Sequence, residues 1–156
     1  MKTRIIAMTM MLCAAFVSPA YFYADDKTVS AEEIRASLKE LKLDVKEEKD
    51  DEDKTVFIIT GKDELITIIY QYGGKGDLGT SIGIRAEFSS EDERSLAPIN
   101  AYNRDERFAK AYIDDEDNIV LEDDLDAGAG VSKEVIQRFV GNFIDSVPSF
   151  LEQITE

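Results

Sequence analysis

The sequence predicts an α+β fold with a single antiparallel sheet, flanked by an N-terminal helix, a short middle helix and a long C-terminal helix. Three observations predict it. A helix-capping motif opens an amphipathic stretch near residue 30. Runs of β-branched residues joined by short turns fill the middle of the chain, and a wide apolar helical face occupies residues 135–151. A length of 156 residues without an interdomain linker indicates one domain.

Residues 1–20 have the pattern of a secretory signal peptide. Lys2 and Arg4 form a basic start, residues 5–17 are an uninterrupted run of apolar and small residues, and Ala20 ends a small-residue cleavage motif. The apolar run is too short for a comfortable membrane span. We therefore expect an exported protein, periplasmic or secreted, with no stable membrane insertion after cleavage.

Cleavage after Ala24 is a second option, although it would place the bulky Phe22 at position −3, where a small residue is expected. The mature protein is expected to form one domain over residues 25–156. The only cysteine, Cys13, would leave with the signal, so the mature chain would enter an oxidising compartment without a thiol.

The composition excludes several classes of function. The net charge of −15 becomes −17 when the signal is removed with its two cations, which argues against nucleic acid and anionic membranes as partners. The sequence has no histidine, and this excludes Ser-His-Asp and Cys-His catalysis and ordinary zinc sites. Basic or apolar partners fit the charge better.

The first elements are a helix and an edge strand. Ser30 and Glu33 form a capping box, and the apolar spacing behind it predicts a helix over residues 30–41. Residues 43–46 alternate, which indicates a short edge strand. The charge run at residues 47–54 is best explained as a solvated hairpin turn, and a cation-binding loop is the alternative.

Residues 55–60 and 65–72 are rich in β-branched and aromatic side chains and predict two strands joined by a hairpin at residues 61–64. Because their apolar runs are nearly continuous, we expect both strands to be central and covered on both faces. The glycine-rich residues 73–79 lack the Gly-Lys-Ser/Thr order of a phosphate-binding loop, so a flexible hairpin loop is expected.

Residues 81–88 alternate cleanly and predict a half-exposed strand, with apolar side chains on one face and polar side chains or glycine on the other. A short helix follows, over residues 95–103. Its predicted N-cap is Ser95, which places Pro98 in the first turn, where the missing amide costs little.

Two further strands, residues 107–114 and 118–125, are expected to pair across an acidic turn. In the first of them, Phe108 and Tyr112 are predicted to share one face, with Ala109 on the other.

The last helix is expected to begin after a Ser132 cap and to present the wide apolar face of residues 135–151. Pro148 is expected to kink or interrupt this helix. The apolar face is wide enough to suggest a homodimer.

The acidic stretch at residues 114–126 is the main candidate for chemistry. An EF-hand starting at its first residue would need Gly and Glu where the sequence has Ile119 and Leu125, so that motif fails. Glu122 and Asp124 could act as paired carboxylates. They alternate with apolar residues as a solvent face does, and we prefer turn and surface roles to a cation site or a hydrolase.

Asn100 and Asn103 lie one helical turn apart. They could present an amide pair to a ligand. The preferred interpretation is that they cap the helix end or join it to the next strand through side-chain to backbone hydrogen bonds.

A family resemblance follows from the pattern INAYNR at residues 99–104, RFAKAYID at 107–114, LEDDL at 121–125 and GVS at 130–132. Together these motifs resemble the YbjN family, whose members are described as regulators of bacterial sensory transduction. The resemblance implies a fold similar to type III secretion chaperones, and no established reaction. Tyr102 replaces a frequent Trp, and the loop at residues 73–79 lacks the cysteines found in many relatives.

These observations predict an exported, non-enzymatic protein-binding or regulatory module with no catalytic residue, metal or cofactor. A protein partner, still to be identified, and a homodimer are the expected assemblies. A divalent-cation-binding protein or a carboxylate-dependent hydrolase is the alternative. The candidate partner-binding or family-motif residues are Asn100, Asn103, Arg107, Phe108 and Tyr112.

Overall fold

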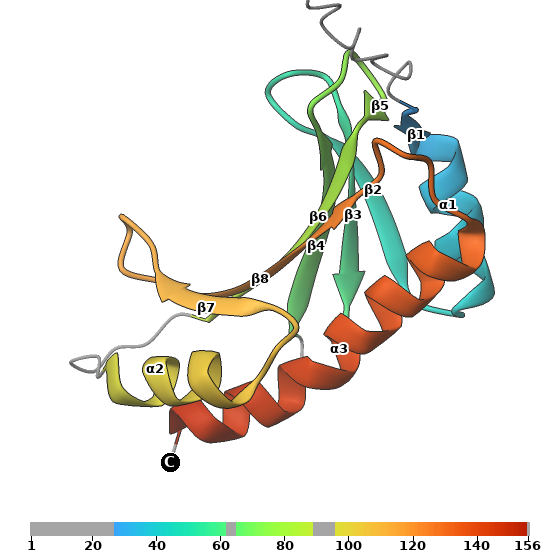
Figure 1. Ribbon diagram of the computed structural model, residues 1–156. Coiled ribbons are helices and arrows are strands. Elements are labelled where there is room, and N and C mark those ends of the chain that lie inside the picture. Colours follow the sequence, from blue (N-terminus) through green and yellow to red (C-terminus); the bar gives the residue numbers. More distant parts are fainter. Residues whose placement is uncertain (1–26, 62–64, 89–95, 156) are drawn as a thin grey trace, which may run out of the picture.

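The computed structural model describes residues 27–61, 65–88 and 96–155. Two layers are visible in Figure 1: a strongly curved antiparallel sheet, and helices that cover one of its faces. The elements in chain order are β1 (Val29–Ser30), α1 (Ala31–Glu40), β2 (Val45–Lys49), β3 (Thr55–Thr60), β4 (Ile66–Tyr72), β5 (Leu78–Gly79), β6 (Ser81–Phe88), α2 (Leu96–Asp105), β7 (Lys110–Ile113), β8 (Ile119–Asp126) and α3 (Lys133–Thr155). The α+β prediction is confirmed.

The main sheet has six strands in the order β2-β3-β4-β6-β8-β7, and all neighbours are antiparallel. The short strands β1 and β5 form a separate ladder that pairs Val29 with Gly79. Helices α1 and α3 lie against one face of the main sheet, and α2 lies beside α3 below β7 (Figure 1). The opposite face, which we call the open face, carries no helix among the described residues.

The alternation of side chains explains why the sheet is anchored on the helical side. Phe57, Ile69 and Ile84 face each other across β3, β4 and β6 and have no exposed surface. Apolar side chains of α1 and α3 cover this row and exclude water from it, which is the main source of stability for such a layered fold. Phe150 of α3 closes the far end, with its ring 4.7 Å from that of Tyr102.

Helix α1 begins as its sequence predicts. The Ser30 hydroxyl accepts a hydrogen bond from the Glu33 amide at 3.2 Å, and the Glu33 carboxylate accepts one from the Ser30 amide at 2.8 Å. Val29 and Ile34 are both buried beside this cap. The capping box and its hydrophobic staple are therefore confirmed.

Helix α3 is continuous through Pro148, so the predicted interruption does not occur. Its cap is confirmed, because the Ser132 hydroxyl accepts a hydrogen bond from the Val135 amide at 3.4 Å. Proline removes one amide donor from the helix interior. Burial of Val147 and Phe150, on either side of Pro148, holds the helix against the sheet in spite of this loss.

The strand after α2 begins later than predicted. Ala109 has a φ of +65°, a left-handed conformation that breaks the β alternation, so β7 starts at Lys110 rather than at residue 107. Phe108 consequently does not share a strand face with Tyr112. Pro98 lies in the first turn of α2 as predicted, whereas the predicted cap Ser95 lies outside the described residues.

The prediction that residues 55–60 and 65–72 are covered on both faces is wrong. Every second side chain of β3 and β4 points to the open face, where Ile66 is 53% exposed and Tyr72 is 38% exposed. An apolar run shows that a strand can be buried on both sides. It does not show whether the chain supplies a second layer, and here α1 and α3 lie on the same side of the sheet.

The remaining turns and loops are of the predicted type, but their lengths differ from the prediction. Pairing with β3 extends the predicted edge strand from residue 46 to Lys49, so the hairpin turn contains residues 50–54. The glycine-rich segment is a hairpin loop, with Gly73 and Gly76 at positive φ. Residues 62–64 and the predicted signal peptide with Cys13 lie outside the described residues.

In the described part of the chain, no helix is both long enough and apolar enough to span a membrane.

Candidate functional site

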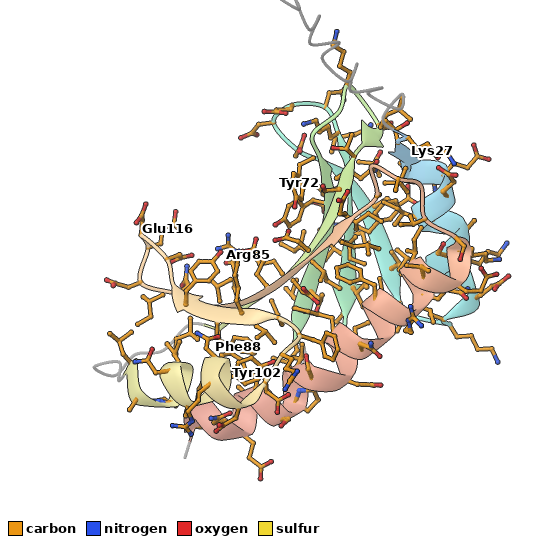
Figure 2. The ribbon with its side chains drawn as sticks, viewed as in Figure 1. Lys27, Tyr72, Arg85, Phe88, Tyr102 and Glu116 are labelled. Atoms are coloured by element: carbon orange, nitrogen blue, oxygen red, sulfur yellow. The ribbon has the colours of Figure 1, made fainter. Side chains whose placement is uncertain are left out.

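The open face of the sheet is the candidate functional site. Figure 2 shows Tyr72 and Arg85 on this side and Glu116 at the tip of the β7–β8 turn, while Phe88 and Tyr102 point to the helical side. The face has two halves. An apolar half is formed by β3 and β4, and a polar half by β6, β8 and β7.

Glu122 is the centre of the polar half. Its carboxylate accepts hydrogen bonds from the Tyr70 hydroxyl at 2.6 Å and the Tyr112 hydroxyl at 3.0 Å. The Lys110 ammonium lies 3.2 Å from the same carboxylate. The Glu122 side chain is only 13% exposed, so one donor from β4 and two from β7 satisfy a mostly buried charge.

The register of the sheet brings these residues together. Glu122 pairs directly with Arg85 on one side and with Lys110 on the other. Tyr70 belongs to β4, two strands away, and its ring reaches Glu122 by lying across Gly83 of β6. A Cβ atom on Gly83 would lie 2.3 Å from the Tyr70 ring, so only glycine leaves room for this crossing.

The electrostatics fix the protonation states of the cluster. Burial raises the pKa of Glu122, but the hydrogen bonds from Tyr70, Tyr112 and Lys110 outweigh that effect and hold the pKa below its ordinary value. Burial and the Glu122 carboxylate raise the pKa of Tyr70 and of Tyr112. At neutral pH the cluster is therefore a carboxylate held by two neutral phenols and one ammonium.

Two further contacts extend the network along the strands. The Tyr72 hydroxyl donates to Asp124 at 2.9 Å. Arg85 donates to Asp114 at 2.8 Å, and its Nε atom also lies 2.8 Å from Glu87, close but not aligned as a hydrogen bond. Each cation of this network faces two carboxylates, so the polar half is held together by ion pairs and keeps an excess of negative charge.

This arrangement does not resemble a catalytic site. The Glu122 carboxylate already accepts from three donors, so it has little capacity left to act as a general base. The raised pKa values of the phenols oppose phenolate formation. The acidic stretch also diverges: Asp114 bonds Arg85 and its own turn, Glu122 faces the open side, and Asp123 points to the helical side opposite Ile84.

The apolar half offers a different chemistry. Val56, Ile58 and Ile68 are half-buried and Ile66 is exposed, so a strip of branched side chains meets solvent along β3 and β4. A shallow pocket of about 330 Å³ opens at one end of the strip. It is lined by Ile66, Ile68, Glu87 and Asn118, which combine an apolar floor with a carboxylate and an amide at the rim.

The predicted site residues do not form one cluster. Tyr112 belongs to the open face, where it bonds Glu122. Asn103 bonds both the amide and the carbonyl of Ala111 at 2.8 Å, which is the preferred structural role predicted for it. Asn100 and Arg107 are exposed, and Phe108 is 71% exposed in the α2–β7 loop.

Sequence reasoning missed Tyr70, Gly83, Arg85 and the central role of Glu122. Tyr70 sits within an apolar run that predicts a strand covered on both faces. Only the pairing of β4 with β6, and of β6 with β8, places it beside a carboxylate 52 residues later. The alternation of residues 81–88 was the one available signal, because it placed Gly83 and Arg85 on the exposed face.

A family profile described as "Putative bacterial sensory transduction regulator" (YbjN) matches residues 30–156. The chain belongs to the YbjN family. This match includes the α1 cap, the whole sheet and α3, so the open face lies within the family domain. Comparison with curated proteins gave no match.

Among solved structures, the YbjN domain resembles the Yersinia pestis type III secretion chaperone SycH, which was crystallised in complex with a stable fragment of YscM2. The TM-score is 0.53 at 10% sequence identity, and the alignment covers 76% of this chain and 97% of SycH. At this identity the likeness shows the fold alone. The chaperone-like fold expected from the sequence is confirmed.

Proposed function

We propose that this YbjN protein is an exported, non-enzymatic regulatory module that binds another protein through the open face of its sheet. The observation that carries the proposal is the strip of branched side chains on β3 and β4, exposed at Ile66 and half-buried at Val56, Ile58 and Ile68, beside a hydrogen-bonded polar network. Exposed apolar patches rimmed by polar groups commonly mark interaction sites. The family description and the chaperone-like fold support a binding role rather than catalysis.

Capture from an envelope extract tests this function. The mature protein is immobilised and crosslinked, and the proteins it retains are compared with those retained by Ile66→Ser and Leu96→Ser variants. Both residues are exposed, 53% and 58%, but Leu96 lies on α2 away from the open face. We expect one reproducible partner, lost with Ile66→Ser and kept with Leu96→Ser. Equal capture by both variants would remove the open face from the proposal.

Export is tested separately, by sequencing the N-terminus of the protein recovered from the envelope fraction. A chain beginning at Tyr21 or Asp25 supports cleavage after residue 20 or residue 24. A full-length chain retained in the cytosol would contradict export.

A homodimer through α3 is a secondary proposal. A groove of about 660 Å³ runs along the C-terminal half of α3 and is lined largely by apolar groups, among them Leu65, Ile144, Pro148 and Leu151. A second copy could cover it. Light scattering at high micromolar concentration should show a dimer that Leu151→Glu dissociates, whereas a monomer throughout would contradict the proposal.

A further inference from the structure

The two hairpin turns at residues 50–53 and 114–117 have the same sequence, Asp-Asp-Glu-Asp, and the same geometry. In each turn the first Asp side chain accepts two backbone amides, at 2.9 and 2.8 Å in the first turn and at 3.0 and 2.8 Å in the second. In each, the last Asp adopts a positive φ, +60° at Asp53 and +63° at Asp117. The turns are therefore rigid and hold their remaining carboxylates in solvent.

The sheet places these turns at opposite ends of the open face. Figure 1 shows the β2–β3 turn at the upper end of the curved sheet and the β7–β8 turn at the far left, both on the side away from α1 and α3. The apolar strip of β3 and β4 lies between them. We call this concave sheet face the trough: its floor consists of the apolar half on β3 and β4 and the polar half on β6, β8 and β7, and an acidic turn lies at each end.

The charge of the trough is not neutralised from within. Its cations are already committed to ion pairs: Lys46 with Glu48, Lys54 with Glu52 of the first turn, Arg85 with Asp114, and Lys110 with Glu122. Among the described residues, no ion pair involves the turn carboxylates of Asp115, Glu116 or Asp117, or of Asp50, Asp51 or Asp53. The complementary ligand is therefore cationic at both ends and apolar in between.

The edges of the sheet leave little room for an added strand. At the β7 edge, Asn103 occupies the amide and the carbonyl of Ala111. At the β2 edge, the strand VKEEK presents charged side chains, and Glu47 is tied to Arg35 of α1 at 2.6 Å. Edge strands with charged side chains or with backbone groups already hydrogen-bonded do not pair readily with another chain. A ligand is therefore expected to contact the open face through the ligand's side chains.

From these observations we infer that the trough binds a cationic amphipathic helix of a partner protein, with the helix's apolar stripe on β3 and β4 and its basic residues near the two Asp-Asp-Glu-Asp turns. The inference rests on the proposed binding function and adds the chemistry of the partner. The eight residues of β6 span about 26 Å, which corresponds to about 17 residues of α-helix. An apolar side chain of that helix would enter the pocket formed by Ile66, Ile68, Glu87 and Asn118.

A designed peptide tests the inference directly. The probe is a fluorescent helical peptide of about 18 residues, made of Leu and Lys with all Leu on one face. Its control has the same composition but scrambled, so that no apolar face forms. Binding is measured by anisotropy at physiological salt, where non-specific attraction to a strongly acidic protein is screened. Saturable binding of the amphipathic peptide, at least about tenfold tighter than the scrambled one, is expected.

Matched variants locate the site. Ile66→Ser should weaken binding about tenfold and Leu96→Ser less than about twofold, because only Ile66 lies in the trough. The pair Asp115→Asn and Asp117→Asn should weaken binding several-fold. The control pair Glu32→Gln and Asp145→Asn removes the same charge from exposed positions on α1 and α3 and should have little effect. Circular dichroism confirms that each variant is folded.

Three results would overturn the inference: equal binding of the scrambled peptide, equal loss with both Ser variants, or equal loss with both charge pairs. Failure of the inference is distinguishable from failure of the proposed function. If the peptide does not bind but an envelope partner is still captured and lost with Ile66→Ser, the binding function stands and the cationic-helix partner is rejected.

Discussion

Gly83 shows how one residue controls the polar half of the open face. Its missing side chain lets Tyr70 cross β6 and bond Glu122 at 2.6 Å. In Gly83→Ala the new Cβ would fall 2.3 Å from the Tyr70 ring, so the ring must leave Glu122. We expect a loss of about 1–3 kcal/mol in the free energy of unfolding, measured by urea denaturation.

Gly141 provides the matched control. It lies within α3, and an added Cβ there would meet no atom within 4 Å. Gly141→Ala should therefore stabilise the protein by about 0.5–1 kcal/mol through higher helix propensity. In a Tyr70→Ala background, Gly83→Ala should cost much less than it does alone. An unchanged cost in that background would show that the Tyr70 crossing is not the reason for glycine.

The contributions of Glu122 and Asp123 to the stability of the fold should depend on pH in opposite directions. Folding lowers the pKa of Glu122, so its contribution to stability is present above the unfolded pKa and is lost as the pH falls through the folded value. Burial raises the pKa of Asp123, so its contribution is present at low pH and is lost as the pH rises.

Thermal denaturation between about pH 7 and pH 3 tests this pair. Glu122→Gln should lower the melting temperature at pH 7 and have a smaller effect at pH 3. Asp123→Asn should raise the melting temperature at pH 7, and this increase should be smaller at pH 3. Shifts of the same sign for both variants would contradict the assigned environments.

At the scale of the elements, the connection from α2 to β7 depends on Asn103. Its two 2.8 Å hydrogen bonds to Ala111 fix the helix end to the edge strand. Asn103→Ala should lower the free energy of unfolding, measured by urea denaturation, by about 1–3 kcal/mol, because the amide and the carbonyl of Ala111 lose their partner. Asn100→Ala, one turn away and exposed, should change stability by less than about 0.5 kcal/mol. Equal effects would show that the edge contact contributes little.

The two serine caps differ in quality and should differ in effect. Ser30 has a complete capping box, whereas Ser132 accepts a single bond at 3.4 Å from the Val135 amide. We therefore expect the free energy of unfolding, measured by chemical denaturation, to fall by about 1–2 kcal/mol in Ser30→Ala and by about 0.5 kcal/mol in Ser132→Ala. The reverse order would contradict the assignment of the box as the stronger cap.

The elements that sequence predicted best are those fixed by local patterns. The bounds of β3 and β6 agree with the predicted 55–60 and 81–88, and the Ser30 cap is where the capping box places it. The start of β7 could not be predicted, because nothing in the local sequence requires Ala109 to adopt a φ of +65°. The Tyr70–Glu122 bond joins residues 52 apart and depends on strand order, which local periodicity does not contain.

At the scale of the whole molecule, the main error of sequence reasoning is also the main lead to function. The apolar runs of β3 and β4 predicted two covered faces, and the described helices cover one. The second face therefore keeps exposed Ile66 and Tyr72 between two acidic turns, in a protein of net charge −15. The affinity of the open face for a cationic partner should fall as the salt concentration rises, because salt screens the attraction between opposite charges.

Hydroxyl-radical footprinting of the protein with and without its captured partner tests directly whether the open face is the binding surface. If the open face is the binding surface, oxidation of Ile66 and Tyr72 should fall on binding, while oxidation of Leu96 and Phe108, which are equally or more exposed, should not change. Protection of Leu96 and Phe108 with unchanged oxidation of Ile66 and Tyr72 would show that the partner binds elsewhere.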